Sequence, residues 1–222
     1  ELQESDASPK PLLYLYDSSE DILFKNPELY DSDRRVCILN FADSISPGGG
    51  YLKGYTTQEE ELCFNSTLYP VLLSFKETFY RKNKECFVEP FGALNGIYSP
   101  DIAFFSGESD ETRVADVITV AAPNIGYYRT RLNPRDFYPD EAGEAAAIAL
   151  QCSIRIKMIF DQAMKHKVTD LVLGAWGCGA FGNDPEVISQ IFKRTAQAYP
   201  DIQTHFVLVG GMSSDIFIRN LK

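Results

Sequence analysis

Five short apolar runs alternate along the chain with longer stretches in which apolar and polar residues recur at helical spacing. The runs are rich in aliphatic and β-branched side chains, which is typical of strands buried on both faces. They occupy residues 11–16, 35–40, 114–122, 170–174 and 204–209.

Three stretches predict helices. The first begins at Thr57, and Pro70 is expected to kink or divide it. The second runs from Asp140 to about Lys165. The third follows Asp184, a good N-cap with a proline after it, and ends near residue 199.

Two stretches are less regular. Residues 84–106 mix aromatic and β-branched residues with Gly and Pro, which predicts a strand pair at one edge of the sheet. A polar loop that carries Arg129, Arg131 and Arg135 is expected before the second helix.

The interleaved order of strands and helices predicts an α/β protein in which helices flank a sheet. No repeat, linker or low-complexity tract interrupts it, so we expect a single domain over residues 11–222 after a frayed end at residues 1–10.

Composition narrows the class of protein. The chain has 222 residues, of which 45% are hydrophobic, enough to bury a core without a disulfide or a structural metal. Its 21 Lys and Arg against 31 Asp and Glu give a net charge of −10, which argues against binding nucleic acid through a general positive field.

The five cysteines form no CxxC pair, which favours free thiols in a reducing compartment, so we expect an intracellular protein, cytoplasmic and/or nuclear. The longest apolar run without a charge is too short to span a bilayer. We therefore expect no membrane partner, no sequence-specific nucleic-acid binding, and a monomer.

The first segment that could carry chemistry contains Gly48, Gly49 and Gly50, followed after seven intervening residues by Gln58-Glu-Glu-Glu61. Consecutive glycines let the backbone approach a ligand and turn its N–H groups toward an anion. A carboxyl group beside a bound phosphate-ribose unit could protonate a leaving oxygen, as glycoside cleavage requires. The structural alternative is that residues 57–60, T-x-x-E, form a capping box.

The second segment is the loop at residues 174–182, which contains G-x-G-x-x-G between a predicted strand and a predicted helix. That context is typical of a dinucleotide fingerprint, so a nicotinamide oxidoreductase is one alternative. However, only one predicted strand remains after the loop, and no acidic residue ends it about 20 residues on. The pattern favours a phosphate-binding loop at a helix N-terminus.

Side chains of this loop suggest further chemistry. Trp176 and Phe181 could stack on a sugar or a base. Cys178 suggests a nucleophile, but only His166 and His205 could act as its base and neither is in a neighbouring loop, so a Cys-His mechanism is disfavoured. Two isolated histidines also argue against a zinc site.

Taken together, the segments resemble the microbial-type poly(ADP-ribose) glycohydrolase family. The resemblance rests on residues 40–42 (NFA), 47–50 (PGGG), 58–63 (QEE followed by LC) and 174–181 (GAWGCGAF), with 120–124 (VAAPN) between them. The order and spacing of GGG and QEE match, and the resemblance covers about Asn40 to Gly211. It implies a three-layer α/β/α macrodomain-like fold in which a mixed central sheet between helices binds ADP-ribose in a cleft.

The resemblance also implies roles for individual residues. Glu60 would be the catalytic acid, Glu59 beside it would hold ribose hydroxyls, and Asn40 would orient the same ribose. The other implied ligand-binding residues are Gln58, then Gly48, Gly49 and Gly50 on the ribose-phosphate side, Gly177, Cys178, Gly179 and Ala180 at the diphosphate, and Phe181, which also lies against the scissile ribose. Asn124 would lie at the rim of the cleft.

The implied activity is that of a metal-independent glycosidase without a cofactor, which hydrolyses the ribosyl O-glycosidic linkage of poly(ADP-ribose) and releases ADP-ribose. Its partner would be ADP-ribose or an ADP-ribosylated protein or polymer. Since basic side chains are few, release from the terminal end is favoured. Two alternatives remain: a hydrolase of mono-ADP-ribosyl acceptors, and a non-catalytic macrodomain that binds ADP-ribose. The chain departs from the family at Phe64, where Arg is usual, and at Glu61, where a small residue is usual.

Overall fold

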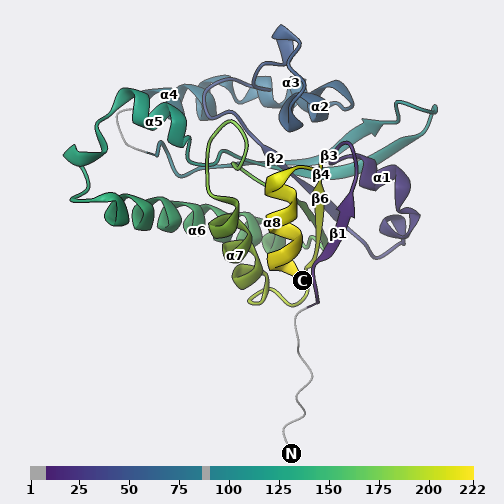
Figure 1. Cartoon of the computed structure of the whole chain (residues 1–222). Coiled ribbons are helices and arrows are strands. Elements are labelled where there is room, and N and C mark those ends of the chain that lie inside the picture. The colour runs from purple at the N-terminus through teal and green to yellow at the C-terminus, as the bar shows by residue number, and fades with distance from the viewer. Residues whose placement is uncertain (1–8, 87–90) are drawn as a thin grey trace, which may run out of the picture.

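A six-stranded mixed sheet forms the centre of the computed structural model, which describes residues 9–86 and 91–222 (Figure 1). Its strands, in spatial order, are β1 (Leu12–Leu15), β6 (Gln203–Leu208), β5 (Asp170–Leu173), β2 (Val36–Phe41), β4 (Thr112–Val120) and β3 (Ile97–Phe105). Neighbours are parallel except β3, which runs antiparallel to β4 at one edge. The mixed central sheet is as expected.

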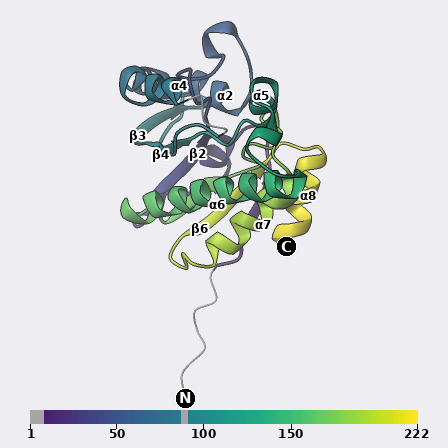
Figure 2. The ribbon, with the colours of Figure 1, turned by 90° about the vertical axis from the view of Figure 1, so that its left-hand side faces the viewer.

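Helices cover both faces of the sheet, as Figures 1 and 2 show. One face carries α6 (Glu141–Lys165), α7 (Pro185–Ala196) and α8 (Met212–Leu221), and the other carries α1 (Asp21–Lys25), α2 (Gln58–Phe64), α3 (Leu68–Ser74) and α4 (Arg81–Glu85). Short turns of 3-10 helix lie at Pro27–Tyr30, Tyr51–Lys53 and Pro134–Asp136, and a π-helical turn lies at Lys76–Tyr80. The three-layer α/β/α architecture is confirmed.

The inner strands β2, β5 and β6 are buried on both faces because each helical layer packs an apolar cluster against the sheet. In β2, Cys37 and Leu39 point into the cluster under α6 and α7, while Val36 and Ile38 point into the cluster under α2 and α3. This alternation explains why the strands appear in the sequence as continuous apolar runs rather than as alternating patterns.

The first predicted helix is divided, but not at Pro70. It stops after Phe64 because the backbone of residues 65–67 pairs with β3: Thr67 N–H donates to the carbonyl of Ala103, and Phe105 N–H donates to that of Asn65. Pro70 then lies in the first turn of α3, where a missing N–H costs little.

Two other expectations need correction. In residues 84–106 the described part contains one strand, β3, which pairs with β4 rather than within a strand pair of its own. Part of that segment, residues 87–90, lies outside the described residues, as does most of the expected frayed end at 1–10. The predicted polar loop instead forms a short helix, α5 (Ile125–Arg131), whose N-cap Asn124 accepts a hydrogen bond from Tyr127 N–H.

The strand directions place the candidate segments together. The parallel strands β2, β4 and β5 all end at the same edge of the sheet, and the loops at 42–50, 121–124 and 174–182 leave from that edge. Crevices outside the carboxyl ends of parallel strands are where open α/β sheets bind ligands.

Candidate active site

Glu59 and Glu60 lie in the first turn of α2 and are both buried, with 3% and 4% of their surface exposed. Oε1 of Glu60 accepts a 2.6 Å hydrogen bond from Gly50 N–H, and Oε2 accepts one from the Thr57 hydroxyl. Thr57 is the N-cap of α2, but its side chain caps no helix N–H. The capping-box interpretation is therefore wrong: the Thr57 side chain bonds the Glu60 carboxyl rather than a helix N–H, and Glu60 also binds the glycine loop.

Glu59 is held by strand β2 and by the loop that follows it. Its Oε1 accepts from Asn40 Nδ2 at 3.2 Å, and its Oε2 accepts from Asp43 N–H at 2.6 Å. Burial raises the pKa of Glu59 to about 8, outweighing these two hydrogen bonds, which lower it. Glu59 therefore keeps its proton at neutral pH.

The glycine loop needs glycine for both conformation and space. Gly49 has φ of +57°, in the left-handed region that favours glycine. A Cβ at Gly49 would lie 2.5 Å from Oε1 of Glu60 and 3.0 Å from Oε2 of Glu59. The sequence predicted that the glycine backbone approaches a ligand closely. In this structure the backbone of Gly49 closely approaches the carboxyl groups of Glu59 and Glu60. Gly48 similarly lies against Tyr69 and Gly50 against Tyr55.

The second loop connects β5 to α7 and contains Gly177, with φ of +74°. Asn183, buried to 3% exposure, stabilises it by donating to the carbonyls of Pro123 and Gly177 at 2.8 and 3.0 Å. A Cβ at Gly177 would lie 2.7 Å from the Asn183 amide nitrogen. Sequence reasoning missed Asn183, whose only signal is its place directly after G-x-G-x-x-G.

Three successive N–H groups of this loop are available for a ligand. Those of Gly179, Ala180 and Phe181 donate no hydrogen bond within residues 9–86 and 91–222, whereas Gly182 N–H bonds Gly179 O and closes the turn. Gly179 and Ala180 are exposed and Phe181 is half-buried. These N–H groups lie in the turn before Asp184, the N-cap of the 12-residue helix α7, and successive backbone N–H groups of this kind can bind an anion.

A cavity of about 180 Å³ lies between the second loop and the start of α2. Its lining comprises Phe41, Thr57 and Gln58 on one side, Ala175, Trp176, Gly177, Gly179, Ala180 and Phe181 on the other, and Ala122. Glu59 and Glu60 lie behind the Thr57 wall rather than on the surface of the cavity.

A second hollow of about 330 Å³ continues the cavity toward β1 and β6. It shares Phe41, Thr57, Gln58 and Gly179 with the first and adds Asp17, Ser18, Glu61, Cys178 and residues 207–210. Together the hollows form one cleft across the carboxyl ends of the sheet.

The carboxyl group of Glu61, which lines the second hollow, has a raised pKa. Burial, followed by the negative charges of Glu20 and Asp21, raises the pKa of Glu61 to about 7.

Two of the predicted ligand-binding or stacking residues have structural roles here. The Gln58 amide joins α2 to β2, because its Oε1 accepts from Phe41 N–H and its Nε2 donates to Leu39 O, both at 2.8 Å. Trp176 is fully buried and donates through Nε1 to Val120 O, so its ring belongs to the core.

The geometry does not support a nucleophilic cysteine. Burial raises the pKa of Cys178 to about 12, so the thiolate is scarce at neutral pH. Of the two histidines, His166 stacks on Tyr98 and His205 bonds Asp170, each away from the loop.

Within the described ranges, no group of three or more His, Cys, Asp or Glu side chains is arranged to hold a metal ion. None of the helices found there is both long enough and apolar enough to cross a membrane.

Comparisons with known proteins identify the fold. It is that of a macrodomain-like α/β protein. Residues 18–107 match the model of the family described as microbial-type PARG, catalytic domain, and the resemblance predicted from the motifs is thereby confirmed. A search among curated proteins finds no match.

Solved structures extend the likeness to nearly the whole chain. Poly(ADP-ribose) glycohydrolase from Deinococcus radiodurans, in complex with ADP-ribose, is 26% identical with a TM-score of 0.79, and the alignment covers 96% of this chain and 84% of that one. The poly(ADP-ribose) glycohydrolase from Thermomonospora curvata, bound to the inhibitor ADP-HPD, is 26% identical with a TM-score of 0.78. That alignment covers 94% of this chain and 78% of that one.

Proposed function

We propose that this chain is an ADP-ribose glycohydrolase that hydrolyses the ribosyl O-glycosidic linkage of poly(ADP-ribose) and releases ADP-ribose from the terminal end. One observation carries the proposal. The buried pair Glu59 and Glu60 lies behind the wall of a cleft whose opposite wall is a glycine loop with three unpaired N–H groups.

In this proposal the phosphates are held by backbone rather than by cations. The N–H groups of Gly179, Ala180 and Phe181 would bind the diphosphate at the entrance to α7. The hollow near Asp17 and residues 207–210 would take the adenosine end. A chain with a net charge of −10 can bind a polyanion in this way, because amide groups act only at short range.

Asn40 supports a role in holding the terminal ribose. It is fully buried, and its Nδ2 bonds Glu59 and Thr119, yet its Oδ1 accepts no hydrogen bond from any described residue. A buried acceptor without a donor costs about 1–3 kcal/mol. A ribose hydroxyl would supply that donor.

In the proposed mechanism Glu60 is the general acid that donates the proton, and Glu59 positions the sugar. Glu60 protonates the 2′-oxygen of the neighbouring unit as the glycosidic bond breaks, and the terminal ribose passes through an oxocarbenium-like state stabilised by the nearby diphosphate. Glu60 then takes a proton from water, whose oxygen bonds to C1, so the acid is regenerated and free ADP-ribose is released.

The decisive experiment incubates an automodified poly(ADP-ribosyl) acceptor with wild type, Glu60→Gln and a matched control, Glu77→Gln. Glu77 is exposed on the helical layer and pairs only with Arg81 among the described residues. We expect the control to release ADP-ribose like wild type and Glu60→Gln to lose about 10²–10⁴-fold in rate. No release by wild type, or equal release by all three, would contradict the proposal.

The same assay separates the alternatives. Tight binding of ADP-ribose by calorimetry with no turnover would favour a binding module, and turnover restricted to mono-ADP-ribosylated acceptors would favour a different linkage. We also propose that the protein acts inside the cell, cytoplasmic and/or nuclear, because its five cysteines are free thiols, which is typical of a reducing compartment. We propose in addition that it acts as a monomer.

A further inference from the structure

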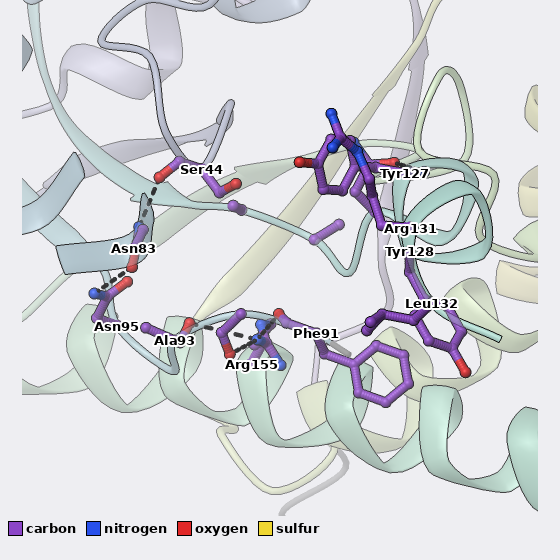
Figure 3. Close-up of a pocket in the computed structure, with 14 residues that line it drawn as sticks. Ser44, Asn83, Phe91, Ala93, Asn95, Tyr127, Tyr128, Arg131, Leu132 and Arg155 are labelled. Carbon is purple, nitrogen blue, oxygen red and sulfur yellow. Dashed lines mark hydrogen bonds between the residues drawn. The ribbon is translucent and has the colours of Figure 1, made fainter. Parts of the chain in front are cut away.

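The loop that holds Glu59 is itself held by the helical layer beside it. Asp43 N–H donates to Oε2 of Glu59 at 2.6 Å. The carbonyl of the next residue, Ser44, accepts from Asn83 Nδ2 at 2.8 Å, and Asn83 Oδ1 accepts from Asn95 Nδ2 at 2.7 Å. The dashed lines in Figure 3 join Asn95 to Asn83 and Asn83 to Ser44. None of the roles proposed above uses Asn83 or Asn95.

One peptide unit, between residues 44 and 45, links Asn83 to Asp43. Asn83 binds its carbonyl, and its N–H donates to Oδ1 of Asp43 at 2.7 Å. The same Oδ1 also accepts from the following N–H, at 2.8 Å, which closes the turn. A peptide unit is planar, so a contact at its carbonyl fixes the direction of its N–H. Asn83 therefore restrains the turn from which Asp43 N–H reaches Glu59.

Asn83 has a defined position because the helix that carries it is anchored in the core. It lies in α4 and has 3% of its surface exposed. One turn earlier, Phe79 and Tyr80 are buried in the apolar cluster under α2 and α3. Residues three apart lie on the same side of a helix, so the burial of Tyr80 directs Asn83 inward as well. The Asn83 amide is engaged at both its oxygen and its nitrogen, which fixes its orientation.

Hydrogen bonds are what favour the ionised form of Glu59. The titratable groups that interact with it among the described residues cannot carry a positive charge: Asp43, Glu60, Cys63 and Tyr80. Burial has the largest effect on the pKa of Glu59 and raises it, and the hydrogen bond from Asp43 N–H lowers it more than the one from Asn40 does. The contact that Asn83 supports is thus the strongest of those that stabilise the charge.

We propose that Asn83, oriented by Asn95, is a positioning residue that directs Asp43 N–H at the carboxyl group of Glu59. Asn83 acts through Glu59 and does not itself contact the sugar. Since Glu59 holds the terminal ribose in the function proposed above, this inference rests on that function and deepens it. It extends the catalytic arrangement from the first turn of α2 to α4, which lies outside the sequence motifs.

A small hollow lies beside this contact. Ser44, Asn83 and Asn95 line part of it, as Figure 3 shows, and its volume is about 40 Å³. That volume has room for about three water molecules. A water molecule can therefore replace the Asn83 amide at the Ser44 carbonyl, so we expect Asn83→Ala to fold with a looser turn rather than with an unsatisfied buried acceptor.

The test observes Glu59 directly. The titration midpoint of its carboxyl group is measured by carbon-13 NMR, with Glu59→Gln to assign the signal. The variants are Asn83→Ala, the milder Asn95→Ala, which is only half-buried, and the matched control Asn26→Ala. Asn26 is also buried and its side chain donates two hydrogen bonds, neither of them to the loop after β2. For each variant, kcat for ADP-ribose release and the Kd of ADP-ribose are measured as well.

We expect the midpoint of Glu59 to rise by about 0.5 pH units in Asn83→Ala, by less in Asn95→Ala and not at all in Asn26→Ala, because a hydrogen bond to the ionised carboxyl is weakened. In Asn83→Ala, kcat should fall about tenfold, since the ribose is held less accurately. The Kd of ADP-ribose should change less than about threefold, because the loop at residues 177–181 still binds the diphosphate.

An unchanged midpoint in Asn83→Ala, or an equal rise in Asn26→Ala, would overturn this inference whether or not the protein releases ADP-ribose. A raised midpoint with unchanged kcat would overturn the positioning role in catalysis. Absence of release by wild type would instead overturn the proposed function, and a rise confined to Asn83→Ala and Asn95→Ala would still support the link from Asn83 to Glu59.

Discussion

The backbone N–H of Gly50 donates a 2.6 Å hydrogen bond to Oε1 of Glu60. The glycine loop after β2 and the first turn of α2 are thus joined at the carboxyl group that is proposed to carry the proton. The position of that carboxyl depends on the loop, and changes to the loop can be used to test the site without changing the acid.

Gly49→Ala tests this dependence. The new Cβ would have to displace Oε1 of Glu60, which lies 2.5 Å away, and the left-handed backbone costs a non-glycine residue about 1 kcal/mol. Gly54→Ala is a matched control, because Gly54 also has positive φ, +75°, but nothing lies within 4 Å of its added Cβ.

We expect Gly49→Ala to lose more stability than Gly54→Ala in thermal unfolding, because only its Cβ displaces a buried carboxyl group, and only Gly49→Ala to lose ADP-ribose release, by at least about tenfold. Equal activity of the two variants would show that the contact between Gly49 and the carboxyl pair is unimportant.

Glu59→Gln tests the raised pKa of Glu59. Because the folded pKa is about 8 and the unfolded value is about 4.3, the folded state binds more protons between these limits. This contribution to stability is fully present below about pH 4 and is lost as pH rises through about 8. We expect the Gln variant to lack this decline.

The measurement is the free energy of unfolding by urea from pH 5 to pH 9, with Glu77→Gln as an exposed control. Parallel curves for wild type and Glu59→Gln would mean that Glu59 is already ionised in the folded protein.

Asp170 is expected to have the opposite effect on the pH dependence of stability, because its pKa is lowered rather than raised. Although its burial acts to raise the pKa, hydrogen bonds from His205 and Thr169 and the charge of Arg34 hold the pKa of Asp170 below its usual value. Its stabilising contribution is therefore present above about pH 4 and is lost as pH falls through the folded value.

Asp170→Asn should lower the free energy of unfolding at pH 7 by about 2–4 kcal/mol, since Asp170 is fully buried and bonds both His205 and Arg34. Below pH 4 the difference from wild type should shrink. A constant difference from pH 3 to pH 7 would argue against an ionised Asp170.

Asn183→Ala tests the support of the diphosphate loop. The change removes two buried hydrogen bonds, to Pro123 O and Gly177 O, which should cost about 2–3 kcal/mol of stability. Binding of ADP-ribose, measured by calorimetry, should also weaken. Asn133→Ala, which removes an exposed turn cap, is the control, and equal binding by the two variants would contradict the role given to Asn183.

The sequence predicted the main features of the site because they are local. Three glycines and, after seven intervening residues, Gln-Glu-Glu define a loop and a helix start, and G-x-G-x-x-G between strand and helix defines the second loop. The features that it could not predict depend on partners far along the chain. The first helix ends at Phe64 because residues 65–67 pair with β3, and Trp176 turns inward because Val120 O accepts its N–H.

Short elements were missed for a different reason. Helix α5 has only seven residues, too few for an apolar period, and the polar arginines within it are typical of a loop. Its formation depends on one capping hydrogen bond, which Tyr127 N–H donates to the Asn124 side chain, and on packing of Ile125 and Tyr128.

Three consecutive side chains at the start of α2 are each committed to a different part of the molecule. Gln58 binds the backbone of β2, Glu59 binds Asn40 and the loop at Asp43, and Glu60 binds Gly50. Since each helical residue is rotated by about 100° from the last, inserting or deleting one residue between Thr57 and Glu60 would misdirect all three at once. We therefore expect an inserted residue to be tolerated better in the turn around Gly54, where an added Cβ meets nothing within 4 Å.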